Sequence, residues 1–517
     1  MKKDILIGID IGSSNVKTVM FDKNYNLLAS EAQEYPTIVP KPGWTEYNPE
    51  DWWNCVKLTL KRVFAKTMIE PTRIAGLGVS SLGCCPVPMN EAGEIVYNGI
   101  PWSDQRAQEE VGFLIKVLGD KIFDICKNFP TTMNCTPHLM WIKNHEPEIY
   151  KKIYKFSEPS GFLAQKFTGE FALDLSFASA TVFGFNMHKI DWDVELIKSM
   201  GLDKEIFPRL HKNTECIGYI NKKAAKDTGL AEGIPVYSGG PDLTAGALAA
   251  GVLYSGQGFY SMGSGANIIA ITDNPEVKSR YLIGWFHAKG SELRMMDGVQ
   301  GSIGYSLRWF RDQFCGLEQK ASELLNKNIS DFQILDLEAS TVKPGSGGIV
   351  YIPYLFGKFH PILNPKAKAA FFGLSPNTNK SHLIKAVMEG CCYDMYESFK
   401  NLQELGLKPR EIVVTGGPSK SNTWCQALAD VTNIPFKTVI APEASPFGDA
   451  ILAGVGSGLF NSLDEVIEDA IKVDKIFTPN EKNHAIYKEL FELYLSIYQS
   501  SIKNYDKLLE IIEKHSL

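Results

Sequence analysis

The 517-residue sequence lacks the features that mark nucleic-acid-binding and membrane proteins. Long Lys/Arg runs and basic amphipathic stretches are missing, and the formal net charge is -6. Such a chain offers no electrostatic footprint for nucleic acid or anionic lipid. The N-terminal apolar run is short and contains an aspartate, so it resembles neither a signal peptide nor a spanning helix. We therefore expect a cytoplasmic protein with a small-molecule partner, and no nucleic acid or membrane partner.

Metal-site, disulfide and common nucleotide-binding motifs are also missing. The ten cysteines show no CxxC pair or zinc-type spacing, and the nine histidines form no HExxH motif. Reduced thiols and no dedicated metal site are the simplest interpretation. Neither GxGxxG nor GxxxxGK[ST] occurs, which disfavours ordinary Rossmann and P-loop nucleotide binding.

The sequence does contain alternating strand-like and helical segments. "RIAGLGVSSLG" and "EIVVTGG" are typical of strands, whereas "PEDWWNCVKLTLKRVFAK" is typical of a helix, which indicates an α/β protein. The last segment predicts a helix that docks on the protein through one face, formed by Ile486, Leu490, Leu493, Tyr494 and Ile497. A chain of this length is expected to divide into two or three domains.

The opening stretch "ILIGIDIGSSNVKTVMFD" predicts two strands joined by a Gly/Ser turn. A partial echo follows in "YSMGSGANIIAITD", where Gly263-Ser264 aligns with Gly12-Ser13. Two related domains could thus each open with the same hairpin. Exposed N–H groups and hydroxyls at such turns can bind phosphate oxygens.

A small-residue segment, Gly239 to Gly258, separates the two copies of this pattern. Small residues suit both close helix packing and hinge motion. We place the domain boundary near Gly251, which predicts an N-terminal domain at 1–250 and a C-terminal domain at 251–517.

Three positions are candidates for chemistry, each with a structural alternative. Asp10 lies within an apolar run and either caps the turn or belongs to a Mg²⁺ shell. Asp242 precedes a helical run; position alone favours a helix N-cap, and a general base is the alternative. Gly416-Gly417 follows a strand and precedes a helix, where the backbone can approach a flat ring or a phosphate.

Eight sequence blocks then resemble those of the FGGY carbohydrate kinases, in the same order and over nearly the whole chain. The resemblance is strongest to the xylulose kinase branch. The blocks are "GIDIGSSNVKTVMFD", "GWTEYNPEDWW", "GIPWSDQRA", "KFTGEFALDLSFAS", "GGPD", "AAFFGLSPNTNKSHLIKAVMEG", "TGGPSKSNTWCQALADV" and "FGDAILAGVGSG".

The resemblance implies two ribonuclease-H-like domains of the actin/hexokinase type with an interdomain cleft, the sugar held mainly by the first domain. It implies ATP and Mg²⁺ as cofactors and a small sugar or polyol as substrate. Asp242 becomes the general base for phosphorylation of a primary sugar hydroxyl, and Asp10 becomes a residue of the Mg²⁺-ATP site. The implied ATP-binding residues are Ser13, Ser14, Lys17, Gly263, Ser264, Gly416, Gly417 and Ser421.

The chain departs from the family on the sugar side. Xylulose kinases carry a Met-His pair where this chain has Gly83 and Cys84. Glycine leaves extra room and a thiol is a weak hydrogen-bond donor, so we expect a larger, less polar pocket. Trp102 and Asp104 match the family's sugar-side block and are predicted to pack against and hydrogen-bond the substrate.

Other functions stay open at this point. The substrate could be a pentulose such as xylulose, or an alditol, hexulose or aldonate. A non-catalytic sugar or nucleotide sensor of the same fold is the alternative from another class, which the presence of Asp10 and Asp242 disfavours. The oligomeric state is also open, with a homodimer as one candidate.

Overall fold

The computed structural model describes residues 3–325 and 328–515, which form two compact units. The first unit contains the chain up to Leu253 together with Asp273–Met295 and Ile440–Lys472. The second contains Tyr254–Thr272, Met296–Val439 and the chain from Val473. The first crossing lies close to the expected boundary at Gly251. The chain then crosses again, because two later segments find their packing partners in the first unit.

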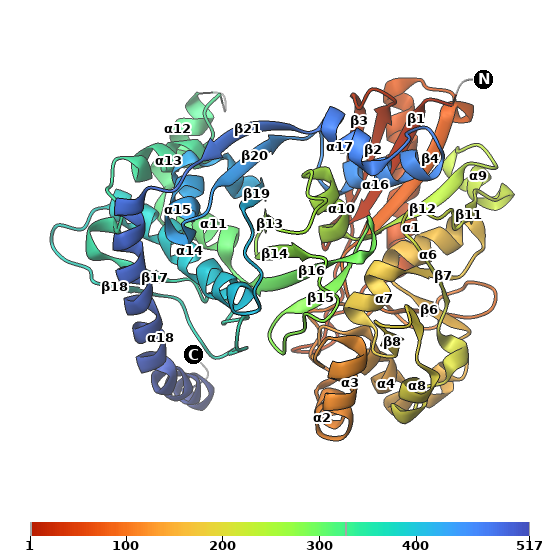
Figure 1. The fold of residues 1–517 in the computed structure, drawn as a ribbon, viewed down its shortest axis with the longest axis horizontal. Helices are drawn as coiled ribbons and strands as arrows, with labels where there is room; N and C mark the ends of the chain where they lie inside the picture. Colours follow the sequence, from red (N-terminus) through yellow and green to blue (C-terminus); the bar gives the residue numbers. More distant parts are fainter. Residues whose placement is uncertain (1–2, 326–327, 516–517) are drawn as a thin grey trace. The chain divides into compact units, whose positions relative to one another are not determined.

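A six-stranded sheet forms the centre of the first unit (Figure 1). Its order is β11-β12-β4-β1-β2-β3. The strands are β1 (Ile5–Ile11), β2 (Asn15–Asp22), β3 (Leu27–Glu34), β4 (Ile74–Ser81), β11 (Gly218–Tyr219) and β12 (Pro235–Pro241). β1 pairs antiparallel with β2 and parallel with β4, and β4 pairs parallel with β12. The predicted opening hairpin is therefore present, with its turn at Gly12, Ser13 and Ser14.

Alternation along β1 assigns its two faces to different helices. Ile5, Ile7, Ile9 and Ile11 share a core with α1 (Pro49–Thr67), the predicted first helix, which Asn48 caps. Leu6 packs in a second core with α16 (Ser445–Gly456). Because side chains alternate with a period of two, Gly8 and Asp10 face the α16 side with Leu6.

Helix α16 comes from the C-terminal half of the sequence but packs directly on the N-terminal sheet (Figure 1). A Cβ atom on Gly8 would lie 1.8 Å from the carbonyl oxygen of Pro446, and one on Gly78 would lie 2.2 Å from that of Asp449. Similarly, a Cβ on Gly239 would lie 1.7 Å from Asp449 Oδ1. Glycine on β1 and β4 thus lets the helix backbone touch the sheet, and glycine on β12 leaves room for the Asp449 side chain.

The other helices of the first unit surround this sheet and a further core that contains Cys84, Leu139 and Phe177. They are α2 (Gln108–Phe113), α3 (Gly119–Cys126), α4 (Cys135–His145), α5 (Pro147–Tyr150), α6 (Pro159–Thr168), α7 (Leu175–Thr181), α8 (Val194–Ser199), α9 (Lys222–Thr228), α10 (Asp242–Ala249) and α17 (Leu463–Ala470). Short pairs of strands join them: β5 (Val87–Met89) with β6 (Lys155–Ser157), β7 (Ala172–Asp174) with β10 (Arg209–His211), and β8 (Phe185–Asn186) with β9 (Asp191–Trp192).

The second unit is built on a sheet that also begins with an antiparallel hairpin. The hairpin joins β13 (Gln257–Met262) to β14 (Ala266–Thr272), and β13 pairs parallel with β19 (Glu411–Gly416). The same sheet contains β20 (Phe436–Ile440) and β21 (Lys472–Phe477). It also contains β15 (Ile283–His287) and β16 (Gly290–Gln300), whose residues up to Met295 are assigned to the first unit. The predicted echo of the opening motif is therefore a second hairpin with a turn at Gly263-Ser264-Gly265.

Six helices accompany this sheet: α11 (Ile303–Phe314), α12 (Gly316–Leu324), α13 (Asp331–Ser340), α14 (Lys380–Glu404), α15 (Asn422–Thr432) and α18 (Glu481–His515). A short pair of strands, β17 (Val350–Ile352) and β18 (Ala370–Phe372), lies in the same unit. α18 is the predicted C-terminal helix, but its buried face differs from the expected one.

The structure buries an aromatic stripe of α18 that shares only Tyr494 with the predicted face. Tyr487, Phe491, Tyr494 and Tyr498 are buried, whereas Ile486 and Leu493 are 44% and 40% exposed. The stripe follows helical spacing and is anchored by hydrogen bonds from Tyr487 to Glu389 and between Tyr494 and Tyr354. Buried tyrosines need such polar partners for their hydroxyls, which an apolar-periodicity argument does not consider.

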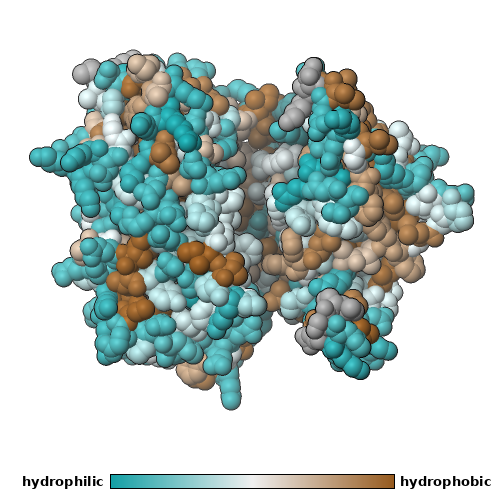
Figure 2. Space-filling view, turned by 180° about the vertical axis from the view of Figure 1, so that it is seen from behind, coloured by the Kyte–Doolittle hydropathy of each residue, from teal (hydrophilic) through white to brown (hydrophobic). Residues whose placement is uncertain are grey.

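Hydrophilic side chains dominate the face drawn in Figure 2, and hydrophobic patches interrupt them. Within the described part of the chain, every helix is too short or too polar to cross a bilayer.

The contact between β1 and α16 can be tested with Gly8→Ala. The added methyl group meets the Pro446 carbonyl, and neither backbone can rotate away. We expect the melting temperature, measured by calorimetry, to fall by about 5 °C or more. Gly112→Ala is the matched control, because a Cβ there has no atom within 4 Å. Equal melting temperatures for both variants would contradict the close approach.

Candidate active site

Three aspartates of the first unit gather at the ends of β1, β4 and β12. Asp10 is the sixth residue of β1, and its neighbour on β4 is Ser80. The Ser80 hydroxyl lies 3.2 Å from Asp10 Oδ1 and 2.8 Å from Asp449 Oδ2 on α16. Asp242 begins α10 immediately after β12. β1 and β12 thus carry Asp10 and Asp242 to one edge of the sheet, and α16 brings Asp449 to Ser80 at the same edge.

Asp242 is not the N-cap that its position alone suggested. Pro241 occupies the N-cap position, and Asp242 is the first residue of the helix. Its Oδ1 accepts a hydrogen bond from the N–H of Leu243 at 2.8 Å, and its carbonyl oxygen accepts one from the Ser445 hydroxyl at 2.9 Å. Both contacts fix the backbone and the carboxyl group of this residue.

The environment keeps protons on these carboxyl groups at higher pH than usual. Burial raises the pKa of Asp242 from 3.8 to about 7, and the negative charge of Asp10 adds to the effect. Burial likewise raises the pKa of Asp10 to about 6, against the opposing influence of Ser80 and Lys17. A carboxylate with a pKa near neutrality is suited to accept a proton from a substrate.

The first Gly/Ser turn presents its hydroxyls to solvent. Ser13 and Ser14 are exposed, whereas the carbonyl oxygens of the turn accept hydrogen bonds from within the protein. The hydroxyls of Tyr35 and Tyr47 donate to the carbonyl oxygens of Gly12 and Ser13, and the N–H of Tyr35 donates to that of Ser14. The described contacts contain no acceptor for the N–H groups of Ser13 and Ser14. The turn can therefore offer N–H and O–H donors to an anion.

Lys17 lies on the next strand, close to the same turn. Its Nζ forms an ion pair with Glu443 at 3.0 Å, and both side chains are only partly exposed. The residue was predicted to contact ATP, and in the structure its charge is already shared with a carboxylate.

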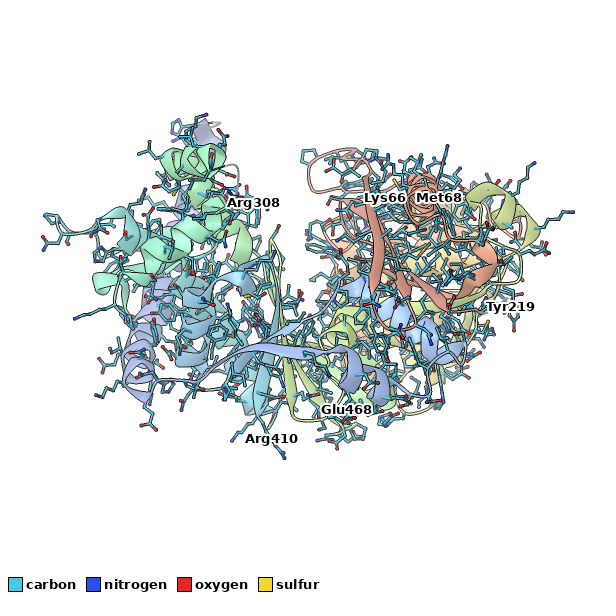
Figure 3. All side chains as sticks on the ribbon, turned by 90° about the horizontal axis from the view of Figure 1, so that it is seen from above. Lys66, Met68, Tyr219, Arg308, Arg410 and Glu468 are labelled. Atoms are coloured by element: carbon cyan, nitrogen blue, oxygen red, sulfur yellow. The ribbon has the colours of Figure 1, made fainter. Side chains whose placement is uncertain are left out.

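The second Gly/Ser turn is held in the same way by different groups. Gly263 and Ser264 are exposed, and their carbonyl oxygens accept hydrogen bonds from the N–H groups of Gly304 and Tyr305 in α11. From the same helix, Arg308 reaches back and donates from Nη2 to the Ser264 hydroxyl at 2.9 Å. Arg308 is exposed at the surface of the second unit (Figure 3).

Ser80, Asp449 and Arg308 were not among the site residues predicted from the sequence. Asp449 is the one charged residue in the apolar stretch "FGDAILAG", and that anomaly was the available signal. Arg308 offered no local signal, because its relation to Ser264 depends on how α11 packs behind the turn.

The turn after β19 contains a glycine with a positive φ and leads to the start of a helix. Gly416 has a φ of +94°, and a Cβ there would lie 2.0 Å from the carbonyl oxygen of Met262. Gly416 and Gly417 are both exposed. Ser421 is the N-cap of α15: it accepts from the N–H of Trp424 and donates to Asp336. Its hydroxyl is thus engaged within the protein, and nucleotide contact by Ser421 stays a prediction.

On the sugar side, Gly83 and Cys84 have different environments. Gly83 is half-buried, and a Cβ there would meet nothing nearer than the Phe177 ring at 3.8 Å, in keeping with the expected extra room. Cys84 is buried with a φ of +26°, and its sulfur lies 3.5 Å from that of Cys135. The Cys84 thiol thus packs in the core beside Cys135, and substrate contact by Gly83 and Cys84 stays a prediction.

Asp104 also has partners other than a substrate. It is fully buried, and both carboxylate oxygens accept hydrogen bonds from the Arg106 guanidinium, at 2.8 and 2.9 Å. Arg106 in turn lies 3.9 Å from the centre of the Trp44 ring. Trp102 is half-buried between two cores. Asp104 therefore orders this segment, and substrate contact by Trp102 stays a prediction.

The described residues fit nucleotide phosphates with a divalent cation. Among residues 3–325 and 328–515, no group of three or more His, Cys, Asp or Glu side chains could hold a metal ion by itself. Mg²⁺ commonly binds through one or two carboxylates together with substrate phosphates, and the partly exposed Asp10 suits that mode. The exposed donors of both turns suit phosphate oxygens.

Two sheets that each begin with a hairpin around a Gly/Ser turn, together with this carboxylate cluster, define a kinase of the actin/hexokinase-type fold. Models of the FGGY family of carbohydrate kinases match residues 5–249 (N-terminal domain) and 258–457 (C-terminal domain). The chain belongs to the FGGY family of carbohydrate kinases. It is thus a sugar kinase, and ATP as phosphate donor is implied by the family.

Similar proteins include kinases for more than one substrate. The xylulose kinase of Bacillus subtilis is 31% identical over 95% of this chain and 96% of that protein. The gluconokinase of the same organism is 27% identical over 98% of both. The crystal structure of ligand-bound xylulose kinase from Lactobacillus acidophilus has a TM-score of 0.87 at 25% identity, covering 98% of this chain and 99% of that chain.

The raised pKa of Asp242 predicts a pH dependence of catalysis. If Asp242 is the general base, protonation removes the acceptor, so kcat/KM for the sugar should fall about tenfold per pH unit below about 7. A pH–rate profile at saturating ATP, with circular dichroism to confirm folding at each pH, measures this. The same shift has the opposite sign for stability: the folded state binds this proton more tightly, so the group's contribution decreases as pH rises from about 4 to about 7. A kcat/KM that is flat down to pH 5 would contradict the assignment.

Proposed function

We propose that the protein phosphorylates a primary hydroxyl of a small sugar with ATP, a pentulose such as xylulose being the favoured substrate. The main support is Asp242, whose carboxyl group is fixed at the start of α10 and has a pKa near neutrality. The xylulose kinases among the relatives support the choice of substrate class.

In this mechanism Asp242 acts as the general base. The O–H bond of the sugar hydroxyl breaks, its proton passes to the Asp242 carboxylate, and the oxygen forms a bond to the γ-phosphorus while the bond to ADP breaks. Mg²⁺-ATP supplies the phosphoryl group and neutralises part of its charge. Asp10 would hold the cation, and the donors of Ser13 and Ser14 would bind phosphate oxygens.

The second unit would contribute to nucleotide binding through its own turn. Ser264 offers a hydroxyl, and Arg308 brings a positive charge to the same turn. Gly416 and Gly417 leave the backbone accessible, which suits the approach of an adenosine group. A cytoplasmic location fits a supply of ATP and the ten free cysteines.

An aldonate, hexulose or alditol is the second candidate for the substrate. The gluconokinase among the relatives and the room at Gly83 favour a bulkier acceptor than a pentulose. ADP release with Mg²⁺-ATP across ketopentoses, ketohexoses, alditols and aldonates, with a no-sugar control, separates these substrates. Release at the control rate with every compound, together with sugar binding, would instead favour a sensor.

Asp242→Asn tests the base directly. Asparagine is nearly isosteric but cannot accept the proton, so turnover should fall by roughly 10²–10⁴ while the melting temperature stays close to that of the wild type. Asp227→Asn, at an exposed position on α9, is the matched control and should keep full turnover. Near wild-type turnover for Asp242→Asn would remove the base assignment.

Arg308→Ala tests the nucleotide contribution of the second unit. Loss of a charge-assisted hydrogen bond to phosphate should raise KM for ATP about tenfold or more and leave KM for the sugar unchanged. Arg410, an exposed arginine before β19 (Figure 3), provides the control Arg410→Ala. If both variants give the same KM for ATP, Arg308 has no role in binding.

A further inference from the structure

Ser80 lies between two carboxyl groups and has a single hydroxyl hydrogen. Its Oγ is 2.8 Å from Asp449 Oδ2 and 3.2 Å from Asp10 Oδ1, so both oxygens are within hydrogen-bond distance. One hydrogen cannot serve both contacts. Two hydrogen bonds along this chain of three oxygens need a second proton, and that proton has to be on a carboxyl group.

The surroundings assign the second proton to Asp449. Its side chain is fully buried, and its Oδ1 has no hydrogen-bond partner among the described residues. An ionised carboxylate with one unpartnered oxygen is costly in such a place, although the contact with Ser80 offsets part of that cost. Asp10, in contrast, is partly exposed and is influenced by the positive charge of Lys17.

The charged groups around Asp449 favour the same assignment. Asp10 on β1 and Asp242 on α10 are both acidic, and each disfavours a further negative charge on Asp449. From β2, Lys17 is paired with Glu443 of the segment before α16. β4 contributes Ser80, and the nearest residue of β12 is Gly239. Burial and the charge of Asp10 raise the pKa of Asp449 well above its ordinary value.

We propose that Asp449 is a positioning residue of this kinase: its protonated carboxyl donates to Ser80 Oγ, and Ser80 donates to Asp10 Oδ1. The Asp10 carboxyl group is thereby held in one orientation at the end of β1. Asp449 touches neither substrate nor nucleotide in this arrangement and acts only through Ser80. The inference rests on the proposed role of Asp10 in the nucleotide site.

The packing of α16 against the sheet restricts the position of the Asp449 side chain. The backbone oxygen of Asp449 lies against Gly78, and its Oδ1 lies against Gly239. One residue earlier, a Cβ on Gly448 would lie 2.0 Å from the carbonyl oxygen of Ala245 in α10. A side chain enclosed on these sides has little freedom, so it can set the direction of the Ser80 hydroxyl.

Three variants test the chain of hydrogen bonds. Asp449→Ala and Ser80→Ala each break it and should lower kcat by about tenfold or more. Asp449→Asn should stay within about threefold of wild type, because an amide N–H replaces the donated O–H. The double variant with Asp449→Ala and Ser80→Ala should have a kcat no lower than that of Ser80→Ala, because both changes break the same series of hydrogen bonds. Ser157→Ala, which removes another buried serine hydroxyl, is the control.

Binding of Mg²⁺-ADP, measured by calorimetry without sugar, is the second readout. We expect weaker binding for Asp449→Ala and Ser80→Ala and unchanged binding for Asp449→Asn. This measurement does not depend on the acceptor, so a wrong substrate or base assignment would leave its result intact. A merely structural role would lower the melting temperature of the Ala variants without weakening the binding of Mg²⁺-ADP to the folded protein.

Two results would overturn the proposal. Asp449→Asn with losses as large as those of Ser80→Ala would show that Asp449 does not donate a proton. Ser80→Ala with wild-type kcat and wild-type Mg²⁺-ADP binding would show that Asp10 needs no such support. Both results remain informative if Asp449→Ala fails to fold, because neither uses that variant.

Discussion

The first unit depends on the close contact between α16 and three strands of its sheet. Glycine at positions 8 and 78 lets the helix backbone touch two strands, and glycine at position 239 leaves room for the Asp449 carboxyl group on the third. This contact places Asp449 next to Ser80 and fixes Ser445 on the carbonyl of Asp242. A helix encoded more than 350 residues after Asp10 thereby supports the strand ends that carry the carboxyl cluster.

The unfavourable free energy of burying these carboxyl groups is linked to the protonation states that their proposed roles require. An isolated buried carboxylate is unfavourable, and each member of the cluster responds with a raised pKa. The three groups differ in exposure: Asp449 is fully buried, whereas Asp10 and Asp242 are partly exposed. Asp449, the most enclosed of the three, is therefore the group best suited to remain protonated. Asp10 and Asp242 are more accessible, so they can exchange protons or bind a cation.

Local patterns predicted the elements of the fold, and tertiary contacts decided the rest. The opening hairpin, α1 and the second hairpin follow from alternation and turn residues that are contiguous in sequence. The packing of α16 on the N-terminal sheet could not be predicted, because an apolar helix does not specify its partner. Likewise, the direction of the Cys84 thiol depends on a left-handed backbone conformation that sequence does not indicate.

The carbonyl groups of the two Gly/Ser turns accept hydrogen bonds from different donors. The contacts of the cationic residues near the two turns also differ. Tyrosine hydroxyls restrain the first turn, and backbone N–H groups of α11 restrain the second. Near the first turn, Lys17 is already paired with Glu443, whereas the described contacts of Arg308 include a hydroxyl and a ring but no carboxylate. The positive charge near the second turn is therefore less compensated than the one near the first turn, which suits the binding of an anion at the second turn.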